Sequence, residues 1–221
     1  AGTDQAQTTQ NAAIELGEAN ATTKRNKVAQ SFTAGKTKLR GLALWKTTNT
    51  GTFTGTVTIS VQADTSGSPS GTALLTKTIT NTEYNALPVG AYDVMFSSEY
   101  SSLVLGSTYW IVIEASTSDT SNHPNIGTNS AGGYSGGSVK AWNTTDGWTA
   151  VATIDLYFKT YEGINSQIVS TDSTGKIPSS IISPLSYQRF LVAVSGVVTH
   201  ISDIAGFCQN SDGSVFYILA K

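Results

Sequence analysis

The chain has 221 residues, a formal net charge of -2 and only 13% charged residues. This weak charge argues against nucleic-acid binding, because proteins that follow a phosphate backbone gather Lys and Arg on one face, and it gives no support for an anionic membrane partner. No apolar run approaches the roughly 20 residues that span a bilayer. We therefore expect neither a nucleic-acid nor a membrane partner.

Ser, Thr and Gly are abundant, whereas Lys, Glu and Leu are scarce, which favours strands over helices. The single cysteine, Cys208, excludes an intrachain disulfide. The first residue, Ala1, suits either removal of a methionine or cleavage of a signal peptide. Composition alone thus predicts an all-β protein without a disulfide framework.

The N-terminal residues 1–27 are polar, and we expect either an exposed arm or an edge strand laid on the body. The segments KVAQSFTA and KTKLRGLALWKT are predicted to pair around a turn at Gly35. The second segment has apolar residues on both faces, with Leu39, Ala43 and Trp45 on one and Leu42 and Leu44 on the other. This pattern predicts a strand buried on both sides.

The segment GTFTGTVTISVQAD alternates strictly between apolar and polar residues. The face expected to be buried is Phe53, Val57, Ile59 and Val61. The face expected to be exposed to solvent is Thr54, Thr56, Thr58, Ser60 and Gln62. Strands are also predicted in TALLTKTIT, AYDVMFS, TYWIVIEAS and TAVATIDLYFKTYEG, the last with Ala152, Ile154, Leu156 and Phe158 on one face. The whole indicates an antiparallel jelly-roll-like β-sandwich over residues 28–162.

The amino-acid composition changes near Gly163. Residues 163–186 are rich in hydroxyl groups and contain two prolines. We expect an extended linker or neck there, followed by a small β segment over residues 187–221. Below roughly 40 residues a segment seldom buries enough surface to stand alone. Its apolar side chains must therefore pack either on the sandwich or on other copies of the chain.

Three segments, VAQSFTA, SGSPSGTALL and LVLGSTYWIVIEAS, resemble jelly-roll-like domains of phage tail and fibre proteins and of choice-of-anchor surface proteins in bacteria with reduced genomes. The matching residues are Gln30, Ser31 and Phe32, then Pro69, Ser70 and Gly71, then Gly106, Tyr109, Trp110, Ile111 and Val112. The resemblance covers residues 28–162, and its motifs are structural rather than catalytic. It therefore implies a fold more strongly than a function.

A second segment, STDSTGKIPSSIIS, is similar to the Gly-Lys-Ile-x-x-Ser-Leu-Leu phrase with which phage tail-fibre and baseplate-associated chains enter a trimeric neck. Here the phrase spans Gly175–Ile182, with Pro178 and two isoleucines in place of the usual residues. This resemblance implies a homotrimer. The expected oligomerisation residues are Ile177, Ile181, Ile182, Phe190, Val192 and Val194.

Together the resemblances imply a non-enzymatic virion protein, either a tail-fibre or receptor-binding subunit or a decoration subunit. Such a subunit would be assembled in the host cytoplasm, would contact other virion proteins, and would display its sandwich to a host-surface glycan. The alternative hypothesis is a secreted bacterial carbohydrate-binding or adhesin module at the cell surface.

Few residues suit catalysis. His123 and His200 lack metal-ligand spacing, and Cys208 has no basic neighbour to lower its pKa. A hydrolase needs only two carboxylates, and the candidates are Asp64, Glu99, Glu114, Asp119, Asp146 and Asp155. Glu114 and Asp155 are expected on solvated strand faces. We therefore predict no catalytic residue, no bound metal and no cofactor.

Binding is predicted instead in the Gly-rich region Asn122–Ala150, interpreted as a long loop. Its candidate ligand-binding residues are Tyr134, Trp142, Asn143, Asp146 and Trp148. Indole rings stack on the C–H faces of sugars while short polar side chains bond to sugar hydroxyls. In the competing interpretation, Trp142 and Trp148 close the open end of the sandwich as core residues, as we expect for Trp45 and Trp110.

Overall fold

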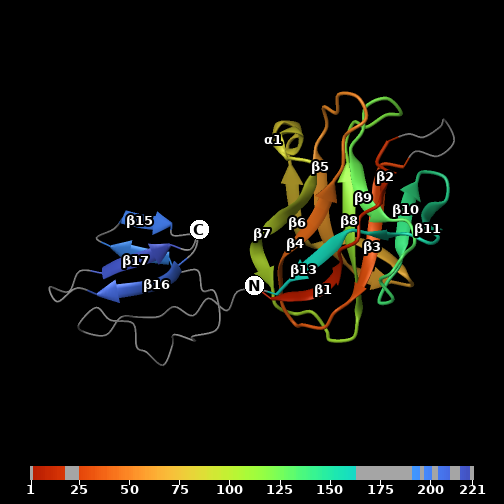
Figure 1. The fold of residues 1–221 in the computed structure, drawn as a ribbon. Helices are drawn as coiled ribbons and strands as arrows, with labels where there is room; N and C mark the ends of the chain where they lie inside the picture. The colour runs from red at the N-terminus through yellow and green to blue at the C-terminus, as the bar shows by residue number, and fades with distance from the viewer. Residues whose placement is uncertain are drawn as a thin grey trace. The chain divides into compact units, whose positions relative to one another are not determined.

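Two compact units, Ala1–Asn165 and Ser166–Lys221, make up the chain. The computed structural model describes residues 2–17 and 25–162 with their side chains, and the backbone of 191–194, 197–200, 204–209 and 215–219. The first unit is a sandwich of two antiparallel sheets (Figure 1), which confirms the predicted fold class. No helix in the described ranges is long and apolar enough to cross a membrane.

One sheet has seven strands, and its members are β1 (Thr3–Gln7), β2 (Ala12–Glu15), β4 (Leu39–Lys46), β7 (Gly90–Tyr100), β9 (Asn125–Asn129), β12 (Asp155–Leu156) and β13 (Phe158–Tyr161). The other has six strands in the order β11-β10-β3-β8-β5-β6. These are β3 (Lys27–Thr33), β5 (Val57–Thr65), β6 (Ser68–Ile79), β8 (Thr108–Ala115), β10 (Val139–Asn143) and β11 (Gly147–Val151).

The inner faces of both sheets form one hydrophobic core. From β5 and the segment before it, Phe53, Val57, Ile59 and Val61 are each at most 1% exposed, as their alternation predicts. The short helix α1 (Asn81–Ala86) covers one end of the sandwich (Figure 1), where Tyr84 packs edge-on against Phe53. Alternation on a half-buried strand is therefore a sufficient signal for the inner face here.

The outer face of β5 is more buried than its sequence predicts. Ser60 and Gln62, expected to be exposed to solvent, are only 7% and 9% exposed. Gln62 lies opposite Trp110 of the neighbouring strand β8, and its amide nitrogen donates to the Ser60 hydroxyl at 3.0 Å. A large indole on the outer face covers its short polar neighbours, and alternation within one strand cannot reveal this.

Strands β3 and β4 do not form the predicted hairpin, because they belong to different sheets and Gly35 lies in the crossing between them. Strand β4 is buried on both faces, as predicted. Its pairing with β7 shifts register between Leu39, opposite Tyr100, and Gly41, opposite Met95. Leu39 lies in the core with Leu42 and Leu44.

The predicted last strand is in fact three. The segment bends at Ala152–Thr153, where Thr153 has a φ of +65°, so that β11 remains in the six-stranded sheet while β12 and β13 join the other. Leu156 and Phe158 reach the core, whereas Ala152 is exposed. Because the chain crosses between the sheets at this bend, one alternating segment contributes strands to both sheets.

The N-terminal residues contribute two strands to the seven-stranded sheet. Strand β1 pairs with β13, with Gln7 opposite Phe158, and β2 pairs with β9, with Ile14 opposite Ile126. Ile14 is 4% exposed and contributes to the core. The described segments Thr3–Gln7 and Ala12–Glu15 are therefore strands of this sheet.

The buried side chain of Gln30 joins the two sheets. Gln30 lies on β3 and is fully buried; its amide nitrogen donates to the Asp155 carboxylate at 3.2 Å, and its oxygen accepts from the Leu156 backbone at 2.8 Å. The other oxygen of Asp155 accepts from the Tyr134 backbone at 2.9 Å. Asp155, expected on a solvated face, is therefore only 4% exposed, and it is balanced by these donors.

The second unit contains two β-hairpins, β14 (Leu191–Val194) with β15 (Val197–His200) and β16 (Ile204–Gln209) with β17 (Val215–Leu219). Val192 and Val194 lie on β14, opposite Thr199 and Val197. The linker and the other predicted oligomerisation residues, Ile177, Ile181, Ile182 and Phe190, lie outside the described residues. The homotrimer stays a prediction.

We predict that Gln30→Ala lowers the free energy of unfolding by roughly 3 kcal/mol, because it leaves a buried N–H and a buried carboxylate without their partner. Chemical denaturation followed by tryptophan fluorescence measures this change, since all four tryptophans lie in the first unit. The control is Gln10→Ala at a half-buried glutamine with one hydrogen bond, to Ala12. Equal losses in both variants would contradict the assignment.

Candidate functional site

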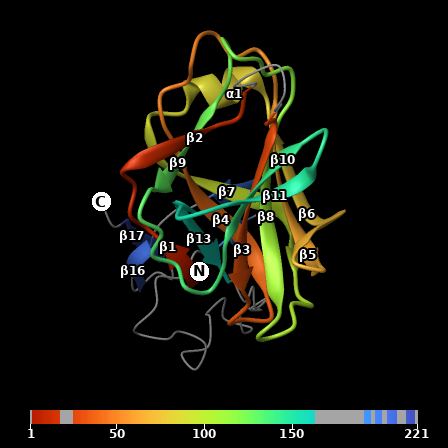
Figure 2. The same cartoon turned by 90° about the vertical axis from the view of Figure 1, so that its right-hand side faces the viewer.

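Two of the predicted binding residues form a cross-strand pair on a hairpin. The region Asn122–Ala150, interpreted from sequence as a loop, contains β9, β10 and β11. Trp142 of β10 lies directly opposite Trp148 of β11, with ring centroids 5.6 Å apart and planes at 70°. Figure 2 shows this hairpin beside β3 at the edge of the six-stranded sheet. We call these two residues the tryptophan pair.

Asn143 and Asp146 shape the turn of the same hairpin. The Asn143 side-chain oxygen accepts from the Thr145 and Asp146 backbones at 2.9 and 2.6 Å, and its amide nitrogen donates to the Asp146 carboxylate at 3.2 Å. Gly147 closes the turn at a φ of +71°, where a side chain would be strained. Asn143 is buried, whereas Asp146 is exposed beside the pair.

The tryptophan pair lies on the outer face of the sheet. Trp148 packs against a small cluster made of Ala29, Trp110 and Val112, which is separate from the inter-sheet core. Trp110, expected in the core, is only 2% exposed but lies in this outer cluster, where its indole nitrogen donates to Asp64 at 2.7 Å. The Trp110 cluster thus forms the surface against which Trp148 packs.

Trp142 has a different surrounding. It packs against neither hydrophobic cluster of the described residues and is half-buried. The Lys27 ammonium lies 5.9 Å from its ring centroid and 3.0 Å from the Glu114 carboxylate. An indole edge and an ion pair therefore border the ring of Trp142.

The remaining predicted ligand residue, Tyr134, lies apart from the pair. Its hydroxyl donates to Gln5 at 2.9 Å, accepts from the Thr33 backbone at 3.4 Å, and its ring packs edge-on against Phe158 at 5.0 Å. Burial raises the pKa of Tyr134. Tyr134 contacts Thr33 at one end of β3, whereas Trp142 pairs with Lys27 at the other end. The structure therefore does not bring Tyr134 to the tryptophan pair.

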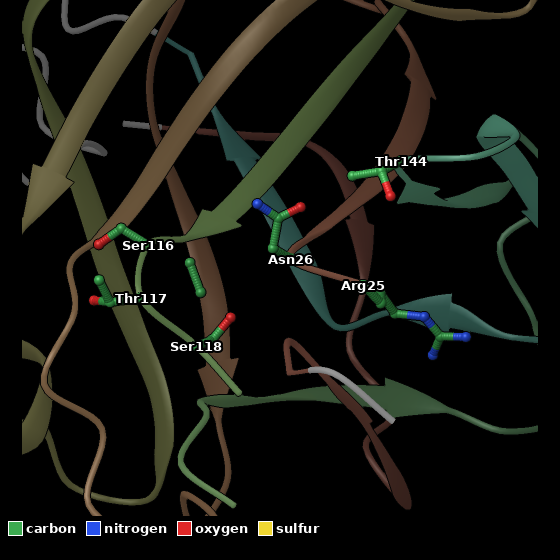
Figure 3. Close-up of a pocket in the computed structure, with 7 residues that line it drawn as sticks. Arg25, Asn26, Ser116, Thr117, Ser118 and Thr144 are labelled. Carbon is green, nitrogen blue, oxygen red and sulfur yellow. The ribbon is translucent and has the colours of Figure 1, made fainter. Parts of the chain in front are cut away.

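A small polar hollow is lined in part by Thr144, from the turn of the hairpin that carries the tryptophan pair. Its volume is about 160 Å³, and its lining residues are Arg25, Asn26, Ala115, Ser116, Thr117, Ser118 and Thr144. We call it the Arg25 hollow. In Figure 3 the Ser118 hydroxyl is directed toward Asn26, whereas the Arg25 guanidinium extends away from the serines. Sequence reasoning missed these residues, since they come from three separate segments.

A second hollow of about 270 Å³ also includes Arg25. Its other lining residues are Ala12, Ala13, Ile14, Glu15, Gly17, Thr128, Val151 and Ile154. The carboxylate of Glu15, one of these lining residues, lies 3.7 Å from the Nε2 atom of His123, which is only 3% exposed. Arg25 thus lines both hollows.

The carboxylates proposed for hydrolysis are engaged with different partners. Asp155 bonds to Gln30, Asp64 to Trp110 and Glu114 to Lys27. Glu99 pairs with Lys38 at 3.3 Å, and Asp119 accepts from its own loop. Within the described ranges no group of three His, Cys, Asp or Glu side chains could hold a metal ion.

Neither a protein-family model, nor a curated protein, nor a solved structure gives a significant match to this chain. The geometry of the tryptophan pair and of the neighbouring hollow therefore carries the functional argument.

We predict that the tryptophan pair gives an exciton couplet in the far-ultraviolet circular dichroism, because its two indoles are held close and nearly edge to face. Trp142→Phe and Trp148→Phe should each abolish the couplet. The control is Trp45→Phe, at a tryptophan that packs on Tyr157 of the other sheet, and it should retain the signal. Survival of the couplet in both pair variants would contradict the geometry.

Proposed function

We propose that this chain is a non-catalytic attachment protein that binds a glycan through the tryptophan pair. The observation that carries this proposal is the half-buried ring of Trp142 on the outer face of a sheet, packed on neither hydrophobic cluster of the described residues. An indole that adds little to the core is free to stack on a ligand. A partly exposed indole provides a flat face on which a sugar ring stacks.

The pair is fixed before any ligand arrives. Trp148 is held against the outer cluster, and Trp142 is held by its cross-strand partner and by Lys27. Little side-chain freedom is then lost on binding, so more of the stacking energy contributes to affinity. This preorganisation supports recognition of a flat, rigid ligand such as a pyranose ring.

Polar groups beside the rings suit the hydroxyl groups of a sugar. Lys27 supplies N–H donors, Glu114 supplies acceptors, and Asp146 is exposed at the turn. Sugars need both a stacking surface and short polar groups around it. The outer face offers both within one hairpin and the two strands beside it.

The setting of the attachment is proposed from sequence resemblance. A phage tail-fibre, receptor-binding or decoration subunit would present this face to the host surface, and a homotrimer would present three copies with a gain in avidity. A secreted bacterial adhesin would use the same face. The glycan-binding proposal is common to both.

A glycan array probed with the full chain tests the proposal. We predict binding to at least one glycan class, and loss of most of it in Trp142→Ala and Trp148→Ala, since removal of a stacked aromatic anchor costs about tenfold or more in affinity. The matched control is Trp45→Ala on the seven-stranded sheet, which should bind as the unaltered chain does. Unchanged binding in both pair variants, or no binding to any glycan, would overturn the proposal.

A further inference from the structure

Four polar side chains around the Arg25 hollow make no hydrogen bond or ion pair in the part of the chain that the structure describes. They are Arg25, Asn26, Ser118 and Thr144. Arg25, Asn26 and Ser118 are half-buried. Ser116, in contrast, is engaged, because its hydroxyl accepts from the Thr56 backbone at 2.8 Å. The four unengaged groups present mainly donors, which suits a ligand rich in acceptors.

Among the described residues that line this hollow, Arg25 is the only charged one. A guanidinium cannot lose its proton in proteins, so a half-buried one favours an anionic partner. Its planar fork of N–H groups matches a carboxylate, with which it forms two parallel hydrogen bonds. The chemistry of the lining thus points to a polyhydroxylated ligand that carries a carboxylate.

Three described acidic side chains near the hollow are neutralised or engaged elsewhere. Glu114 pairs with Lys27 at 3.0 Å. Asp119 accepts from the Ser121 and Asn122 backbones at 2.7 and 2.8 Å, and the first of these hydrogen bonds lowers the pKa of its carboxyl. Glu15, in the adjoining hollow, faces His123. None of these carboxylates lines the Arg25 hollow.

The hollow and the tryptophan pair share one end of the sheet. Thr144 follows Trp142 by two residues in the hairpin turn, and Asn26 directly precedes Lys27, whose ammonium lies over the Trp142 ring. Both therefore stand on the same two segments of the chain, β3 with the residue before it and the β10–β11 turn. The hollow also contains a strained residue, Thr117, at a φ of +47°. Such conformations are rare for β-branched residues and cluster at functional sites.

We propose that the Arg25 hollow binds a uronic-acid-type sugar, with its ring hydroxyls on Asn26, Ser118 and Thr144 and its carboxylate on Arg25. The Arg25 guanidinium, which extends away from the serines in Figure 3, has to turn toward the hollow for this contact. This proposal rests on the glycan-binding function proposed above, and it names the charge class of that glycan. The neighbouring sugar unit then stacks on Trp142.

Nuclear magnetic resonance of the ¹⁵N-labelled full chain tests this inference with two probes, D-galacturonic acid and D-galactose, which differ in the carboxylate at C6. Galacturonic acid should shift the backbone amides of Ser116–Ser118 and the side-chain Nε–H signal of Arg25. Galactose should shift these signals about tenfold less at the same concentration, because it lacks the charged partner. Equal shifts from both sugars, or none from galacturonic acid, would overturn the inference.

Two variants make the test specific. Arg25→Gln should remove the response to galacturonic acid, and Arg25→Lys should keep part of it, because lysine retains the charge but not the planar fork. The matched control is Arg40→Gln, at a half-buried arginine on β4, which should respond as the unaltered chain does. A response that survives Arg25→Gln would contradict the proposed carboxylate contact.

The results also separate this inference from the proposed function. Glycans that bind through the tryptophan pair without any preference for a carboxylate would remove only the Arg25 assignment. A galacturonic acid response at Arg25, with array binding unaffected in Trp142→Ala and Trp148→Ala, would instead remove the role of the tryptophan pair.

Discussion

The contact of Gln30 with Asp155 and the Leu156 backbone holds β3, the strand that pairs with the outer-face hairpin, against the other sheet. It joins the sheets through a fully buried amide, and Asp155 in turn binds the Tyr134 backbone. Ser31, the next residue on β3, exchanges hydrogen bonds with Ser138, and the backbone passes so close at Gly137 that a Cβ atom there would clash with the Ser31 carbonyl. These contacts place β10 beside β3.

The candidate site follows from that placement. With β10 fixed on β3, the hairpin carries Trp142 and Trp148 onto the outer face and brings its turn to the Arg25 hollow. The two tryptophans then differ in their roles, because Trp148 packs on the Trp110 cluster and Trp142 does not. A rigid scaffold thus holds one indole as support and leaves its partner accessible to a ligand.

Sequence reasoning succeeds where one strand decides the outcome and fails where two distant segments do. Alternation predicts the inner face of β5, and residue type identifies Trp142 and Trp148 as binding candidates. The glycines of Asn122–Ala150 favour a loop, so the sequence does not reveal that the tryptophans face each other across a hairpin. The burial of Asp155 depends on Gln30, which is 125 positions away. A pattern within one short segment of sequence cannot predict a contact between residues so far apart along the chain.

The most direct test of the account is a crystal structure of the full chain with a bound acidic oligosaccharide. We predict that one sugar ring stacks on Trp142 and that a carboxylate of the adjacent sugar unit contacts the Arg25 guanidinium. A sugar bound instead at Trp45 on the seven-stranded sheet, or one that touches neither Trp142 nor Arg25, would contradict the assignment of the outer face of the six-stranded sheet as the attachment surface.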